Sequence, residues 1–250
     1  MKSPYLNKPI ATWPQITKRL LAKHPLSTEL ILDVANQSWN ALWSTRVGAG
    51  RTAIDLNQLV VPATVVGYFF EVLFAKEMER RFPREWRGCR QGDEKDLVYI
   101  PDSRYSVEIK TSGQLGLRVF GNRSYGQKAS KQRLAKKEKS GFYITVNFFR
   151  QTFVLIRFGW IDASDWKPQL APTGQMAGLP DEVYAHKLVP IGGKYQLLAP
   201  VGILPGVGVK AAAELAKLHI ATVGDLLGYK QTLPAKLVKI RDAANANYRG

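Results

Sequence analysis

Residues 96–110 read DLVYIPDSRYSVEIK, an apolar run, then turn residues, then a second apolar run. This order predicts a β-hairpin with strands at 96–100 and 105–110 and a turn at 101–104. The hairpin is informative about both fold and function, because it combines a strand pairing with an unusual set of charged side chains.

Those charged side chains are expected to converge. Side chains alternate between the two faces of a strand, so Glu108 and Lys110 should share one face while Ile109 points into the core. Antiparallel pairing folds Asp96 back beside residues 108–110. Two carboxylates and one ammonium group are therefore predicted at one place.

This set of groups suits phosphodiester hydrolysis. Mg²⁺ prefers oxygen ligands and keeps several waters, so Asp96 and Glu108 suffice to anchor it. The metal would polarise a phosphoryl oxygen and lower the pKa of a bound water. Lys110 could orient or activate the attacking water and offset charge in the transition state.

Glu71 is a further candidate for the metal site. It lies in a predicted helix, residues 62–81, beside the apolar run Gly67-Tyr68-Phe69-Phe70. A carboxylate next to so much apolar surface is costly unless it has a partner, which a metal or Lys110 could supply. The alternative is that Glu71 lies on the solvated face of its helix.

The spacing of these residues resembles the PD-(D/E)xK nuclease superfamily, which includes most type II restriction endonucleases. That family has a metal-binding acid at one strand, an acid-x-Lys at the next and an acid on a preceding helix. Asp96, Glu108, Lys110 and Glu71 match these positions in turn. The resemblance implies a restriction-endonuclease-like fold, Mg²⁺ as cofactor and double-stranded DNA as substrate.

One departure from the family pattern concerns the first acid. Asp96 follows Lys95 and not a proline, whereas a literal Pro101-Asp102 pair occurs five residues before Glu108. A hairpin turn that tight would leave Asp102 at the far tip. Asp102 is therefore rejected as a metal ligand.

Patterns on either side of the hairpin predict the remaining elements. Apolar residues recur at helical spacing in 13–23, 26–43 and 62–81, and strands are expected at 141–149 and 152–160. Residues 162–190 are rich in proline and glycine and are expected to be irregular. The order predicts an α/β core over residues 1–190, with a mixed sheet flanked by helices.

The segment 117–139 is strongly basic, with eight Lys and Arg residues against one acid. A helix is expected over 127–139. Because the segment directly follows the predicted active site, its cations are expected to contact DNA phosphates. A solvated helix face is the alternative.

Within this segment, Asn, Arg and Gln are side chains that can bond bidentately to base edges. The DNA contacts are assigned to Asn122, Arg123, Gln127, Lys128 and Lys131. The stretch 120–127 is similar to segments of the ScaI-like group of type II restriction enzymes. The alternative is a loop that packs and contacts phosphates only.

From about residue 195 the chain becomes rich in Ala, Leu and Lys, which predicts a small all-α domain over 195–250. In it, Gly206 and Gly208 open a helix, where backbone N–H groups can approach an anion. The pattern resembles the helix-hairpin-helix motif, which grips DNA phosphates, with Lys210 as the phosphate-facing cation. A purely structural glycine turn or a dimerisation module are the alternatives.

Composition agrees with a DNA-binding enzyme. The 250 residues include 36 Lys and Arg against 20 Asp and Glu, a net charge of +16, which favours a polyanionic partner. Cys89 is the only cysteine, which excludes internal disulfides and thiolate metal clusters, and it is expected in the core. No apolar run is long enough to span a membrane, so a cytoplasmic location is expected.

The function predicted is that of a type II restriction endonuclease, cutting double-stranded DNA at a specific site. Cutting both strands with one site per chain favours a homodimer, and a restriction enzyme would need a separate DNA methyltransferase partner. A Holliday-junction resolvase or repair nuclease of the same superfamily is one alternative, and a DNA-binding protein without catalysis is another.

Overall fold

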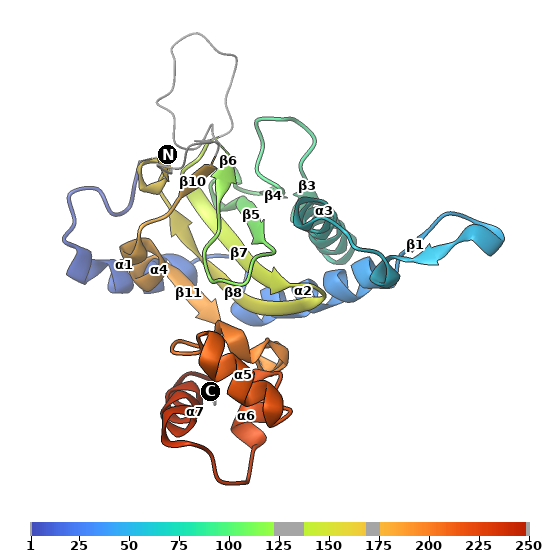
Figure 1. Ribbon diagram of the computed structural model, residues 1–250. Coiled ribbons are helices and arrows are strands. Elements are labelled where there is room, and N and C mark those ends of the chain that lie inside the picture. Colours follow the sequence, from blue (N-terminus) through green and yellow to red (C-terminus); the bar gives the residue numbers. More distant parts are fainter. Residues whose placement is uncertain (1, 123–137, 169–175, 249–250) are drawn as a thin grey trace.

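A six-stranded mixed sheet forms the centre of the protein (Figure 1). The computed structural model describes residues 2–122, 138–168 and 176–248. The strands follow the order β11-β8-β7-β5-β4-β3 across the sheet. Their bounds are β3 Trp86–Gly88, β4 Leu97–Tyr99, β5 Val107–Ser112, β7 Gly141–Phe149, β8 Thr152–Ile161 and β11 Leu188–Ile191.

Only β5 and β7 run parallel, and the other neighbours in this sheet are antiparallel. The predicted α/β fold with a mixed sheet is therefore confirmed. The predicted hairpin is also present, with Leu97 opposite Val107. A short 3-10 helix, η4 (Ser103–Tyr105), fills its connection because the Asp102 side chain accepts a hydrogen bond from the N–H of Arg104.

Three helices precede the six-stranded sheet in the chain. A short 3-10 turn, η1 (Ile10–Thr12), leads into α1 (Trp13–Ala22), which is followed by α2 (Thr28–Trp43) and α3 (Ala63–Arg81). They agree with the predicted helices, except that α2 begins two residues late. Ser27 caps it by accepting from the N–H of Leu30, which fixes the first turn.

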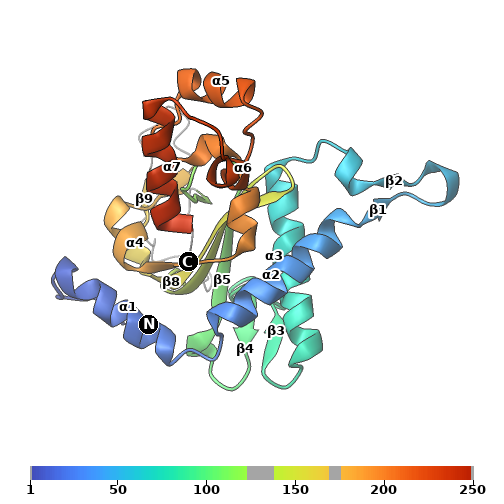
Figure 2. The same cartoon turned by 90° about the horizontal axis from the view of Figure 1, so that it is seen from below.

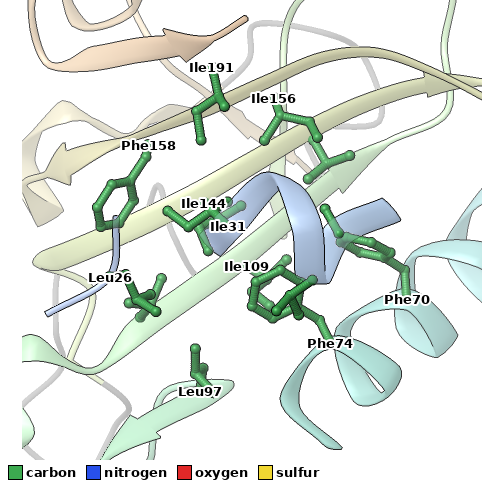
Figure 3. Close-up of a cluster of buried hydrophobic side chains, with 14 of the residues drawn as sticks. Leu26, Ile31, Phe70, Phe74, Leu97, Ile109, Ile144, Ile156, Phe158 and Ile191 are labelled. Atoms are coloured by element: carbon green, nitrogen blue, oxygen red, sulfur yellow. The ribbon is translucent and has the colours of Figure 1, made fainter. Parts of the chain in front are cut away.

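The main core lies between these helices and one face of the sheet. Figure 3 shows Ile31 of α2, Phe70 and Phe74 of α3, and Ile109 and Ile144 of the sheet turned toward one another. All five are fully buried. Ile109 thus points into the core, as the alternation along β5 predicted.

The opposite face of the sheet is covered differently. A three-stranded sheet, β6-β10-β9, and α4 (Asp181–His186) pack there around Tyr143 and Trp166. The small strands are β6 Gly121–Asn122, β9 Lys167–Pro168 and β10 Met176–Gly178, and η6 (Ala163–Asp165) precedes β9.

The expectation of irregular structure over 162–190 is therefore wrong. Two of the prolines that suggested it occupy tolerated places: Pro180 precedes α4, and Pro190 lies in β11, an edge strand. The predicted helix over 127–139 falls mostly outside the described residues, and 138–139 are not helical.

A two-stranded arm projects from the body between α2 and α3 (Figure 2). Its strands are β1 (Arg46–Val47) and β2 (Ile54–Asp55), with η2 (Gly50–Thr52) between them and η3 (Leu56–Gln58) after them. Gly48 and Gly50 have φ values of 93° and 57°, a left-handed conformation that favours glycine at this turn.

The last part of the chain is helical. It comprises η7 (Lys194–Leu198), η8 (Val201–Ile203), α5 (Val209–Lys217), α6 (Val223–Gly228) and α7 (Ala235–Tyr248). These helices have their own apolar cluster, which also includes Val154 of β8. None of the helices in the described part of the chain is long and apolar enough to cross a membrane.

Candidate active site

The β4–β5 hairpin places Asp96 against the backbone of β5. The N–H of Ile109 donates to Asp96 Oδ2 at 2.8 Å. The backbones of β4 and β5 pair at Leu97 and Val107. Farther along β5, a backbone N–H donates its hydrogen bond to the Asp96 side chain instead. Asp96 therefore lies beside residues 108–110, as the hairpin predicted.

Glu108 and Lys110 form a close ion pair on the face of β5 opposite the main core. Lys110 Nζ donates to Glu108 Oε1 at 2.6 Å and to the carbonyl oxygen of Ile109 at 3.2 Å. The side chain of Glu108 is 1% exposed and that of Lys110 is 17% exposed. A carboxylate buried to this degree needs a nearby cation, and Lys110 provides one.

Lys110 also interacts electrostatically with all three predicted acids. Burial alone would lower the pKa of its ammonium group. The negative charges of Glu108, Asp96 and Glu71, with the hydrogen bond to Glu108, outweigh burial and raise the pKa above its ordinary value. Glu71, half-buried on α3, thus acts on the same lysine as the hairpin acids.

A cavity of about 430 Å³ opens beside these residues, between α3 and the strands β3 and β4. Both Glu71 and Asp96 line it. The remaining lining residues are Tyr68, Val72, Ala75, Lys76, Glu79, Gly88, Cys89 and Arg90. Glu71 is therefore half-buried and faces a hollow that it shares with Asp96.

The described residues contain no group of three or more His, Cys, Asp or Glu side chains arranged to hold a metal ion. Asp96, Glu108 and Glu71 surround Lys110 but do not form a common three-ligand set in this arrangement. Their carboxylates are nevertheless the hard oxygen donors that Mg²⁺ prefers. The metal assignments of these three residues stay a prediction.

Two other residues of the region are placed clearly. Asp102 lies in the hairpin connection and pairs with Arg104, with Oδ2 and Nη2 2.7 Å apart, so the rejected acid is engaged away from the site. Cys89 was expected in the core, and this is wrong: it is exposed at the rim of the cavity. It follows the short strand β3, which no pattern in the sequence predicted.

The predicted DNA contacts after β5 are only partly described. Asn122 ends β6, the last residue before 123–137. Arg123, Gln127, Lys128 and Lys131 lie outside the described residues. Their roles stay predictions.

The predicted phosphate-binding glycines lie at the start of α5. Gly206 has a φ of 87°, and Gly208 is the N-cap residue, where an added Cβ would meet nothing within 4 Å. Lys210 is exposed in the first turn of the helix. The backbone here is open to solvent, as phosphate binding would require.

A group of side chains that the sequence patterns did not predict holds the chain just after β5. Arg157 donates to the carbonyl oxygen of Leu117 at 2.9 Å and to Asn147 Oδ1 at 2.9 Å. Asn147 in turn donates to the carbonyl oxygen of Arg118 at 2.9 Å. The hydroxyl of Tyr184 accepts from the N–H of Val119 at 3.0 Å.

These three side chains fix residues 117–119, where the basic segment begins. Asn147 and Arg157 are fully or almost fully buried. Polar residues inside otherwise apolar strands were the signal that could have identified them, because a buried charge is rare unless it has a specific partner.

Two matches to known proteins indicate the family of this chain. A family model described as ScaI restriction endonuclease matches residues 3–192. The chain is 35% identical over 198 residues to the type II restriction enzyme ScaI of Streptomyces caespitosus, which covers 76% of this chain and 84% of that enzyme. No solved structure matches the chain. The family match spans the sheet and its covering helices and ends before η7, so α5 to α7 lie outside it. On this extent of similarity, the chain belongs to the ScaI restriction endonuclease family.

Proposed function

We propose that the chain cuts both strands of duplex DNA at a specific sequence by hydrolysing phosphodiester bonds, with Asp96, Glu108 and Lys110 as catalytic residues. The observation that supports this most directly is the geometry around Lys110. Its ammonium group lies 2.6 Å from Glu108 Oε1 and is acted on by the charges of Asp96 and Glu71. An isolated structural ion pair would not need two additional acids beside a cavity.

Mg²⁺ is the cofactor proposed for this site. Asp96 and Glu108 would hold it, with Glu71 as a third acid from α3. When bound, the ion would polarise a phosphoryl oxygen and favour ionisation of water. The donor chemistry supports Mg²⁺ because all three side chains offer carboxylate oxygens and no His or thiolate is needed.

The protein groups have separate tasks. The N–H of Ile109 holds Asp96 in position through the 2.8 Å hydrogen bond to its carboxylate. Lys110 neutralises the buried Glu108 in the free protein and would offset negative charge that develops on the phosphate during the reaction. Its short distance from Glu108 keeps this cation fixed before DNA binds, so little reorganisation is needed.

DNA binding is proposed to rest on the basic segment 117–139. Arg123, Lys128 and Lys131 would contact phosphates or bases beside the active site, while Asn122 and Gln127 would read base edges. The side chains that fix residues 117–119 support this proposal, because they set where the segment leaves β5.

The C-terminal helices are proposed as a second DNA-binding unit of the helix-hairpin-helix type, with residues 195–250 forming a separate domain. The exposed backbone at Gly206 and Gly208 would approach a phosphate, and Lys210 would add a cation. Such contacts grip DNA without reading its sequence. Deleting residues 195–250, or changing Lys210 to Glu, should weaken binding to all duplexes alike and reduce its salt dependence.

The assembly proposed is a homodimer, because one active site per chain must be used twice to cut a duplex. A separate DNA methyltransferase would protect the host sequence, and both enzymes would act in the cytoplasm.

The proposed function can be tested by digesting a set of plasmids in Mg²⁺. The intact protein should give discrete fragments with a common end sequence, while Asp96→Ala and Lys110→Ala should give none. Asp102→Ala is the matched control, since it removes an acid from the same hairpin but outside the site, and it should cut normally. Cutting that survives Asp96→Ala would refute the catalytic assignment. Cutting of branched DNA alone would indicate a junction-specific nuclease.

A further inference from the structure

An exposed apolar stripe runs along α3, the helix that carries Glu71. Its members follow helical spacing and are 40–66% exposed: Val65, Tyr68, Phe69 and Val72. The core-facing residues of the same helix, Phe70 and Phe74, are fully buried. α3 therefore has two apolar faces, one of which is not covered by the described part of the chain.

Further exposed apolar residues precede the helix in the chain. Val60 is fully exposed, Leu59 is 38% exposed, and the arm adds Val47 at 50% and Ile54 at 45%. Eight of the sixteen exposed large apolar residues in the described part of the chain fall within residues 47–72. Apolar residues gathered in this way on a monomer surface usually mark an interaction site.

Charge indicates which kind of partner this surface fits. Residues 52–75 contain no Lys or Arg, although the chain has 36 of them in 250 residues. Residues 47–72 therefore include a single cation, Arg51, and are poorly suited to DNA phosphates, which basic residues contact. A protein of net charge +16 repels its own copies wherever cations are dense, so this segment is where repulsion between copies is weakest.

We propose that the apolar surface of residues 47–72 binds the same surface of a second copy of the chain, across a two-fold axis. The inference rests on the proposed function in one respect, since cutting both strands requires two active sites. It adds the location of the contact: Glu71 lies on the interface helix, and Tyr68 and Val72 of the stripe also line the active-site cavity. Each active site would then border the interface.

The size of the surface approaches that of a standard dimer interface. Specific interfaces use roughly 20–30 residues on each side. Residues 47–72 are 26 residues, of which 18 are exposed. The projecting arm (Figure 2) extends the surface beyond the body of the protein, so the arm of one copy could reach α3 of the other.

The test is the oligomeric state of the full chain, measured by analytical ultracentrifugation without DNA or metal. The unmodified protein should sediment as a dimer, and Phe69→Glu should weaken dimerisation by at least about 30-fold. Ile100→Glu is the matched control, because Ile100 is 48% exposed and Phe69 is 47% exposed, and it should remain dimeric. Circular dichroism and thermal unfolding would confirm that each variant folds.

If Phe69→Glu fails to fold, Val65→Lys tests the same surface, because Val65 is 40% exposed. At concentrations where it is monomeric, the folded variant should nick supercoiled plasmid faster than it linearises it. A monomeric unmodified protein, or a folded variant that stays dimeric, would overturn the proposal. Loss of DNA binding with an intact dimer would assign the surface to DNA and overturn it as well.

These outcomes are separable from failure of the proposed function. Asp96→Ala should be dimeric and inactive. If it were dimeric and still cut DNA, the catalytic assignment would fail while the interface stood. If the unmodified protein cut DNA but remained monomeric, the interface would fail while the catalytic assignment stood.

Discussion

Replacing Lys110 by Met should destabilise the metal-free protein much more than replacing Glu108 by Gln. Nζ and Oε1 are 2.6 Å apart, and the side chain of Glu108 is only 1% exposed. At an effective dielectric constant of about 20, two unit charges at that distance attract by about 6 kcal/mol. Desolvation offsets much of this in the intact pair, but Lys110→Met leaves the carboxylate buried without its cation.

The expected loss for Lys110→Met is therefore about 3–5 kcal/mol, the usual result of removing one partner from a buried pair. Glu108→Gln should cost only about 1 kcal/mol, because Lys110 keeps Asp96 and Glu71 as neighbouring anions. In the double variant no unpaired charge remains at Glu108, so it should be more stable than Lys110→Met alone.

Urea unfolding in EDTA measures these differences, provided that the slopes of the transitions agree. The pair Arg104 and Asp102 is the matched control: its atoms are 2.7 Å apart, but the arginine side chain is 75% exposed. Arg104→Met should cost at most about 1 kcal/mol. Equal losses for Lys110→Met and Glu108→Gln, or a larger loss for Glu108→Gln, would refute the reasoning.

Three further predictions follow from other parts of the structure. Burial lowers the pKa of His24 from 6.5 to about 4. The folded protein should therefore lose about 3 kcal/mol of stability as pH falls from 6.5 to 4. In urea unfolding over that range, the His24→Gln variant should lose less stability than the unmodified protein. A Cβ at Gly67 would lie 2.1 Å from Thr111 Oγ1. Gly67→Ala should therefore cost about 1–3 kcal/mol in stability and reduce the cleavage rate about tenfold or more. Adding Thr111→Ala should partly restore both. Arg157→Met should raise KM for DNA more than it lowers kcat in steady-state cleavage, because Arg157 holds the carbonyl oxygen of Leu117, where the segment predicted to contact DNA begins.

Burial lowers the pKa of His24, and the hydrogen bond at Nδ1 acts in the same direction. The N–H of Leu26 donates to Nδ1, which therefore carries no proton, and Nε2 bonds to the carbonyl oxygen of Tyr105. Protonation of Nδ1 would break the first bond, so only the unfolded chain binds the proton between pH 6.5 and 4. An unchanged pH dependence in His24→Gln would contradict this account.

For Gly67, a variant that loses activity and does not recover with Thr111→Ala would exclude the proposed clash.

The sequence predicted those features that depend on local patterns. Alternation along β5 predicted that Ile109 would be buried and that Glu108 and Lys110 would share the other face. Helical spacing predicted the three N-terminal helices, and the short turn predicted that Asp96 would return beside β5. In each of these cases, the spacing of apolar, charged or turn residues is compatible with only a few local structures.

Other features depended on contacts between distant segments. β11 lies beside β8 only because the chain returns to that edge, and Pro190 within it resembled a loop residue. Arg157 and Asn147 hold residues 117–119 across 40 and 29 positions of sequence, respectively, so no local pattern could reveal their partners. Cys89 is a small apolar residue that the core could have held, and only the position of β3 at the cavity rim leaves it exposed.

The one parallel pairing in the sheet, between β5 and β7, has an evolutionary consequence. Parallel neighbours require a crossover of about a dozen residues or more, and here the connection is the 28 residues from 113 to 140. Two of the residues proposed for catalysis, Glu108 and Lys110, belong to the strand, whereas the segment predicted to read DNA belongs to the crossover. Substitutions and insertions in that connection would leave the register of β5 untouched. A lineage with this topology could therefore acquire a new recognition sequence while inheriting the same hydrolytic chemistry.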